Sequence, residues 1–86
     1  MGSSRKGRTM RIRIETPVDL GSAVRRARRS RRLRQEDLAL GAGTGVRFIG
    51  ELERGKPTVQ LDPTLRVLHA LGIAIELDDG AADDDA

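Results

Sequence analysis

The sequence has 86 residues, of which 37% are hydrophobic, so it can form one domain with a small core that a second copy of the chain would help to stabilise. It contains no cysteine, no run of membrane-spanning length and no signal peptide, which excludes disulfides and thiol chemistry and predicts a cytoplasmic protein without membrane contact. The net charge of +3 divides unevenly: residues 1–34 contain twelve basic and two acidic residues, residues 35–72 four and five, and residues 73–86 none and six.

The two ends of the chain carry opposite charge and have little to bury. Residues 1–9 are polar and basic, so we expect a disordered arm, with Met10 as an alternative translation start. Residues 78–86, DDGAADDDA, are expected to form a disordered acidic tail. The folded domain should therefore span residues 10–77, and its basic first half predicts a polyanionic partner.

The first elements expected are a strand and a helix. Residues 10–15, MRIRIE, alternate apolar and polar side chains, which predicts a half-buried strand. Thr16, Pro17 and Asp19 follow the pattern of a capping box, so a helix should begin here and run to about Arg31. One face of this helix carries Leu20, Ala23, Val24 and Ala27, and the opposite face carries Arg25, Arg26, Arg29 and Arg32. The arginine face is open to two interpretations, a solvated surface or a contact surface for DNA or a protein.

The next two helices are short and are separated by glycine. A second helix is expected over residues 35–42, ending at Gly43, and a third over about residues 45–54, ending at Gly55. On the third helix Phe48, Ile49 and Leu52 fall on one side, and Val46, Arg47, Gly50, Glu51 and Arg54 fall on the other. Two short helices joined by such a turn have the spacing of a helix-turn-helix.

The last elements expected are a fourth helix and a short strand. Asp62 as N-cap and Pro63 as first residue predict a helix that buries Leu65, Leu68 and Leu71 and ends at Gly72. Residues 73–77, IAIEL, alternate in the manner of a strand, with Ile73, Ile75 and Leu77 on one side.

No arrangement of residues predicts an enzyme, a metal site or a cofactor. Ser22 and Ser30 have no identifiable base, and His69 has neither a second histidine nor a cysteine near it. The glycines of residues 41–45, GAGTG, follow a helix and not a strand, unlike those of a phosphate-binding loop. Phe48 is expected to pack in the core.

At residues 33–56 the sequence resembles the helix-turn-helix of the lambda repressor/Cro-like (Xre) family. The residues that carry this resemblance are Gln35, Leu38, Ala39, Gly43, Ile49, Glu53 and Gly55. Over residues 11–77, through TPVDLG, ELERGKPT and LRVLHALGIAIEL, the sequence is similar to the HipB-type antitoxins. The resemblance implies a mainly α fold of four to five helices, in which a short C-terminal β-strand forms an intermolecular sheet in a dimer.

The resemblance also implies a role for individual residues. The positions that correspond to base contacts are Val46, Arg47 and Glu51, and those that correspond to phosphate contacts are Arg34, Gln35, Gly45, Arg54 and Lys56. Arg28 and Glu53 correspond to a structural ion pair between the first and third helices. Ile73, Ile75 and Leu77 are the expected dimer interface, either with the same strand of a second chain or with residues 11–15 of either chain.

Four residues depart from the family pattern. Arg32 stands where glycine usually ends the first helix, and Arg34 and Gly45 stand where serine or threonine usually caps the next two helices. Gly50 replaces a common serine and should cost about 1 kcal/mol relative to alanine within a helix. A cation such as Arg34 is unfavourable at a helix N-terminus unless an anion, such as a DNA phosphate, lies beside it.

The function implied is that of a dimeric repressor that binds operator DNA, controls its own operon and binds a HipA-like kinase toxin as its antitoxin. Two alternatives remain: a stand-alone repressor of the same fold, and an interaction module that mainly binds a toxin, with DNA binding secondary. A neighbouring gene for a HipA-like kinase would distinguish the first two, and a DNA-binding assay would distinguish both from the third.

Overall fold

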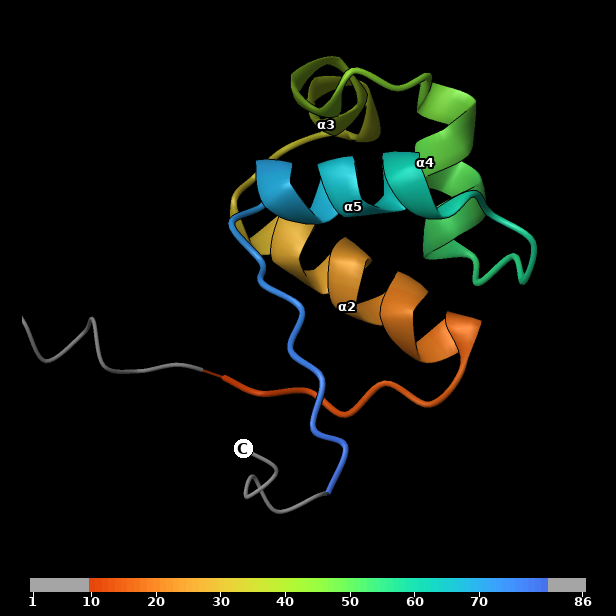
Figure 1. Cartoon of the computed structure of the whole chain (residues 1–86). Coiled ribbons are helices and arrows are strands. Elements are labelled where there is room, and N and C mark those ends of the chain that lie inside the picture. The colour runs from red at the N-terminus through yellow and green to blue at the C-terminus, as the bar shows by residue number, and fades with distance from the viewer. Residues whose placement is uncertain (1–9, 81–86) are drawn as a thin grey trace, which may run out of the picture.

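Residues 10–80 are described by a computed structural model in which the regular secondary structure is entirely helical. The helices are α2 (Pro17–Ser30), α3 (Gln35–Ala42), α4 (Val46–Glu53) and α5 (Leu61–Ala70), as Figure 1 shows. None of them is long and apolar enough to cross a membrane. The predicted arm at residues 1–9 and most of the predicted tail lie outside the described residues.

The capping box predicted for the first helix is present. The hydroxyl of Thr16 accepts a hydrogen bond from the Asp19 backbone N–H at 3.2 Å, and the Asp19 carboxylate accepts one from the Thr16 N–H at 3.1 Å. The Asp19 carboxylate also accepts a hydrogen bond from the Glu15 N–H, which is the main cause of its lowered pKa; burial opposes this effect and the Thr16 bonds add to it. These local bonds explain why the helix begins where the sequence predicts.

The core lies between α2 and α4 and between α3 and both α4 and α5. Its fully buried members are Val24, Leu38, Ala39, Ala42, Ile49, Leu52, Val67, Leu68 and Leu71, with Phe48 packed against them from the edge. Gly21 allows α2 to lie close to the end of α4, because a Cβ atom there would overlap the carbonyl oxygens of Leu52 and Glu53. α2 and α4 are thereby held in direct backbone contact.

The prediction for the start of the fourth helix was wrong by two residues. The helix begins at Leu61 with Gln60 as N-cap, and Pro63 occupies its third position. Proline is tolerated there because the first N–H groups of a helix have no intrahelical acceptor. The Thr64 hydroxyl donates to the Gln60 carbonyl at 2.7 Å, which fixes the first turn. Leu65 is only half-buried, and Val67 takes the fully buried position beside Leu68.

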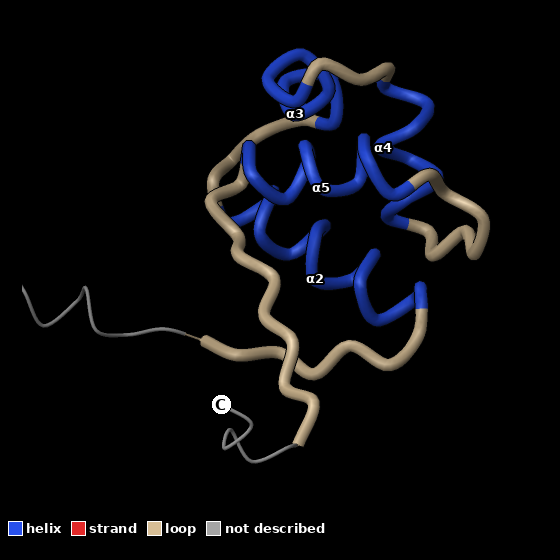
Figure 2. Tube along the Cα trace, in the orientation of Figure 1, coloured by secondary structure: helices blue, strands red, loops and turns tan. Residues whose placement is uncertain are grey.

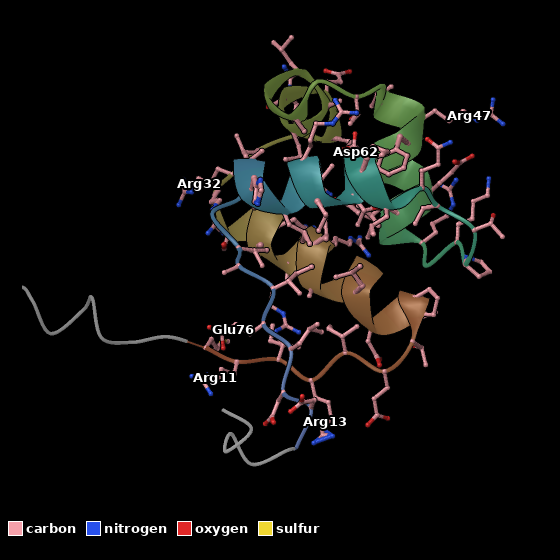
Figure 3. The ribbon with its side chains drawn as sticks, viewed as in Figure 1. Arg11, Arg13, Arg32, Arg47, Asp62 and Glu76 are labelled. Atoms are coloured by element: carbon pink, nitrogen blue, oxygen red, sulfur yellow. The ribbon has the colours of Figure 1, made fainter. Side chains whose placement is uncertain are left out.

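Neither predicted strand forms in this single chain. Within residues 10–80, both residues 10–15 and residues 73–77 run as extended segments without strand pairing, which Figure 2 shows as continuous loop. The two segments pass each other, and Arg11 Nη2 lies 3.9 Å from Glu76 Oε1 (Figure 3). A strand needs a partner for its backbone groups, and the predicted partner is a second chain. The intermolecular sheet therefore stays a prediction.

At the end of α2, Arg32 has a backbone conformation that is unfavourable for any residue with a side chain. Arg32 has φ of 56°, the left-handed region, and the Leu33 N–H donates to the Arg28 carbonyl at 3.1 Å, as in a glycine-terminated helix. A side chain in this region costs about 1–2 kcal/mol relative to right-handed backbone.

We therefore predict that Arg32→Gly stabilises the fold by about 1 kcal/mol, measured as the free energy of unfolding in urea. Arg31→Gly is the matched control, because Arg31 has a φ of −97° and should gain nothing from glycine. An equal effect of the two substitutions would show that removal of positive charge, and not backbone strain, is responsible.

Candidate nucleic-acid interface

The turn between α3 and α4 is built on glycine. Gly43 has φ of 73°, a left-handed conformation in which the Thr44 N–H reaches the Ala39 carbonyl at 2.9 Å. Gly45 is the N-cap of α4 and offers no side chain to the first N–H groups of that helix. The N-terminus of α4 is therefore open to an anion.

One side chain of α5 holds this turn in place. The Arg66 guanidinium donates to the Gly43 carbonyl at 2.9 Å and to the Ala42 carbonyl at 3.4 Å, and it pairs with Asp62 one turn earlier at 3.3 Å. It thus satisfies carbonyl groups at the end of α3. Arg66 was not among the predicted residues, because nothing in the local pattern of α5 indicates a contact with a turn more than twenty residues away.

The outer face of α4 presents the three residues predicted to contact bases. Val46 is 46% exposed and the Arg47 side chain is 90% exposed, extending away from the body of the protein (Figure 3). Glu51 is less exposed, and its carboxylate lies 3.3 Å from Arg47 Nε and 3.5 Å from Lys56 Nζ. Arg47 therefore projects from this face as a cation, and the Glu51 carboxylate is paired with two cations, Arg47 and Lys56.

Gly50 was predicted to belong to this outer face, and the structure corrects that prediction. Gly50 is buried, with the side chains of Arg54 and Gln35 next to it. A helical wheel gives the direction of Gly50 on α4. It does not show that the side chains of Gln35 and Arg54 cover Gly50.

At the start of α3, no side chain accepts from the free N–H groups of the first turn, and only the reverse half of a capping box is present. The Arg34 N–H donates to the Asp37 carboxylate at 2.8 Å, and this hydrogen bond is the main cause of the lowered pKa of Asp37, with burial acting against it. The Arg34 side chain is 76% exposed, at 3.5 Å from Asp37 and 3.7 Å from Glu36. Its charge is thus available at the surface beside the N-terminus of α3.

Arg28 and Glu53 form an ion pair, as the family resemblance implied. Arg28 Nε and Nη2 donate to Glu53 at 2.6 and 3.0 Å, and Gln35 Nε2 donates to the same carboxylate at 3.1 Å. Arg28 also donates to the Leu33 carbonyl at 2.7 Å. These bonds join α2, α3 and α4, and Gln35, predicted as a phosphate contact, is part of this buried network.

Burial raises the pKa of Glu53, but hydrogen bonds from Arg28 and Gln35 and the nearby positive charges outweigh it, so the pKa lies below its ordinary value of 4.5. The hydrogen bond to Glu53 raises the pKa of Arg28 in turn, against the effect of burial. The pair is therefore charged at neutral pH, and a lowered carboxylate pKa means that the ionised form is stabilised in the folded state.

Glu53→Gln is predicted to lower the free energy of unfolding by about 3 kcal/mol near neutral pH, because it leaves the buried Arg28 charge without a counter-ion. The stabilisation by Glu53 is fully present above its unfolded pKa and is lost as the pH falls through the lower folded pKa. Urea unfolding at a series of pH values should therefore show the difference between wild type and variant shrinking below about pH 4.5. Glu36→Gln is the control, since the Glu36 side chain is 68% exposed. A difference that stays constant down to pH 3 would contradict this account.

The structure thus places the start of α3 beside Gly50 and Glu53 of α4, a helix that also has an uncapped N-terminus and an exposed outer face. No protein-family model matches the chain. The chain is, however, 50% identical over 68 residues to the uncharacterized HTH-type transcriptional regulator y4mF of Sinorhizobium fredii (strain NBRC 101917 / NGR234), a match that covers 79% of this chain and 90% of that protein. The protein belongs to the family of helix-turn-helix (HTH)-type transcriptional regulators, a class of DNA-binding proteins that are generally not enzymes.

Solved structures confirm the helical part of the predicted fold. The HipB–O4 20mer complex matches with a TM-score of 0.73 and 23% identity over 80% of this chain and 97% of that chain, and a chain of the HipA–HipB–O2–O3 complex matches with the same values. The restriction-modification controller protein C.AhdI from Aeromonas hydrophila matches with a TM-score of 0.61 and 34% identity, over 67% of this chain and 84% of that one. The mainly helical HTH fold of the HipB type is therefore established, without the C-terminal strand.

Proposed function

We propose that this HTH regulator is a sequence-specific repressor that binds duplex DNA as a homodimer, with α4 of each chain in the major groove. The observation that carries the proposal is the exposed outer face of α4 next to the uncapped N-terminus of the same helix. Val46, Arg47 and Glu51 read base edges, and the two α4 helices of the dimer lie about 34–36 Å apart, one turn of DNA. A cytoplasmic location, where a regulator meets its DNA, is part of this proposal.

The phosphate contacts are assigned to groups around that face. The N–H groups after Gly45 and the side chains of Arg34, Arg54 and Lys56 bind the DNA backbone, which supplies affinity without sequence information. Gln35 contributes through its backbone at the start of α3, because its side chain is bound to Glu53. These assignments are supported by exposed cations at Arg34, Arg54 and Lys56.

Arg47→Ala should change the consensus sequence selected from a randomised duplex library, because an arginine that binds guanine provides about 1–3 kcal/mol of discrimination. Glu51→Ala should change it as well. Arg34→Ala is the matched control: it should weaken binding to all duplexes alike and reduce the salt dependence of log K by about one unit per chain. An unchanged consensus for both α4 variants would refute the base-reading role.

The dimer is proposed to form through an antiparallel sheet of residues 73–77 from two chains, related by a twofold axis and packed over α5. In the single chain Ile75 and Leu77 are 53% and 92% exposed, and Ile12 and Ile14 of the neighbouring extended segment are 44% and 41% exposed. Such exposed apolar side chains on two adjacent segments are typical of an association surface. The sheet could be widened by residues 10–15.

Ile75→Asp is predicted to convert the dimer to a monomer in analytical ultracentrifugation and to lower operator affinity at least tenfold, because it places a charge in an apolar layer. Leu40→Asp is the control, since Leu40 is 85% exposed on α3 and lies outside the proposed sheet. Should the Ile75 variant remain a dimer with unchanged operator affinity, association through the helices would be the better explanation.

We further propose that the regulator is the antitoxin of a HipA-like kinase and represses the operon that encodes both proteins. The similarity of its fold to a chain of the HipA–HipB–O2–O3 complex supports this proposal. A stand-alone regulator is the second candidate, since the name of the 50% identical y4mF gives a transcriptional regulator and no toxin. Co-expression with the product of an adjacent kinase gene separates them: a stable complex supports the antitoxin, and a chromosomal locus without any such gene supports the stand-alone regulator.

A further inference from the structure

A polar cleft of about 270 Å³ lies where α2, α3 and α4 meet. Its walls are formed by Arg25, Arg28, Gln35, Gly50, Glu53 and Arg54. Gly50 leaves its floor free of a side chain, since an added Cβ would lie 3.3 Å from Arg54 Nη1 and 3.9 Å from Gln35 Oε1. The cleft is thus kept open by a glycine one residue before the base-reading Glu51.

The inner and outer walls of the cleft differ in how their charges are satisfied. Inside, Arg28, Gln35 and Glu53 are bonded to one another, so one positive and one negative charge cancel. Outside, the guanidinium groups of Arg25 and Arg54 make no hydrogen bond or ion pair to any part of the chain between residues 10 and 80. Arg25 is close enough for its charge to lower the pKa of Glu53. The cleft therefore carries two uncompensated positive charges at its mouth.

We propose that Arg25 and Arg54 bind one DNA backbone phosphate at the mouth of this cleft, so that α2 takes part in DNA binding. This inference rests on the proposed function and adds a contact from outside the helix-turn-helix. Guanidinium groups bind phosphate oxygens through paired, charge-assisted hydrogen bonds, and the two that line this cleft can share one phosphate. The start of α3 and the end of α4 form the same cleft, which places the phosphate beside the α4 face that enters the groove.

The same observation divides the arginine face of α2. Arg26 and Arg29 line a separate hollow with Ser22 and Ser30, and no residue of α4 contributes to it. Arg25 borders both sites and alone reaches the cleft. Arg26 and Arg29 are therefore assigned to the solvated surface, where they act only through their long-range field.

The test uses the full chain and two duplexes of about 20 base pairs, long enough for two half-sites one turn apart. One duplex is selected from a random library and the other is a scrambled version. Arg25→Ala and Arg54→Ala should each weaken binding to both duplexes about tenfold in fluorescence anisotropy. The double variant should lose less than the product of the two single losses, because both arginines hold one phosphate. It should also lower the salt dependence of log K by about one unit per chain.

Arg26→Ala and Arg29→Ala are the matched controls and should each change affinity less than about twofold, since a long-range field is screened by salt. Arg25→Lys should recover part of the affinity because it restores the charge. The melting temperature of Arg25→Ala should stay close to that of the wild type, because the guanidinium makes no hydrogen bond or ion pair within residues 10–80 and stabilises the fold only through its weak charge interaction with Glu53.

Wild-type affinity of Arg25→Ala would overturn the inference, and so would equal losses for Arg25, Arg26 and Arg29, which would indicate a general field. Strictly multiplicative losses for Arg25 and Arg54 would also overturn it, because they would indicate separate phosphates. If Arg34→Ala and Arg47→Ala behave as proposed while Arg25→Ala is silent, only this inference fails. If the wild type binds neither duplex at low salt, the proposed function fails and the inference with it.

Discussion

The geometry of the surface proposed to face DNA depends on one buried carboxylate. Glu53 accepts hydrogen bonds from Arg28 of α2 and Gln35 of α3 while it ends α4, so a single group fixes the three helices relative to one another. Its side chain is 4% exposed, and a buried charge tolerates little displacement from its partners because the alternative is an unpaired ion in a poorly solvating medium. A rigid junction of this kind is what a reading helix requires, since base contacts need defined positions.

Around that junction the charges follow a simple division. Inside the junction, Arg28 and Glu53 neutralise each other. At its edge lie exposed cations that lack a strong partner, namely Arg25, Arg34 and Arg54. Close like charges repel, so the free protein carries an electrostatic cost on this side that a row of phosphates would remove. The residues that look misplaced from local rules, above all an arginine at a helix N-terminus, are consistent with a surface selected for a polyanion.

The sequence predicted those parts of the fold that local chemistry determines. Thr16 and Asp19 start α2, and Gly43 ends α3, through contacts within a few residues, so their helix boundaries were correct. The start of the fourth helix was predicted two residues too late, because Asp62 and Pro63 are as acceptable within the first turn of a helix as at its N-cap and first position. Contacts between distant residues, such as Arg66 on the turn or Arg25 on the cleft, leave no local signal. The strand predicted at residues 73–77 differs in kind, because its proposed partner is a second chain.

Stability and DNA binding should be coupled in this molecule. α4 has eight residues, an N-cap without a side chain and an internal glycine, all of which weaken a helix, and α2 ends in a strained arginine. The junction at Glu53 holds α4 in place from one end only. A phosphate at the open N-terminus would supply the missing cap, and one at the Arg25 and Arg54 cleft would reinforce the other end. Because a ligand that binds only the folded state stabilises it, DNA would complete the part of the fold that the sequence leaves weakest.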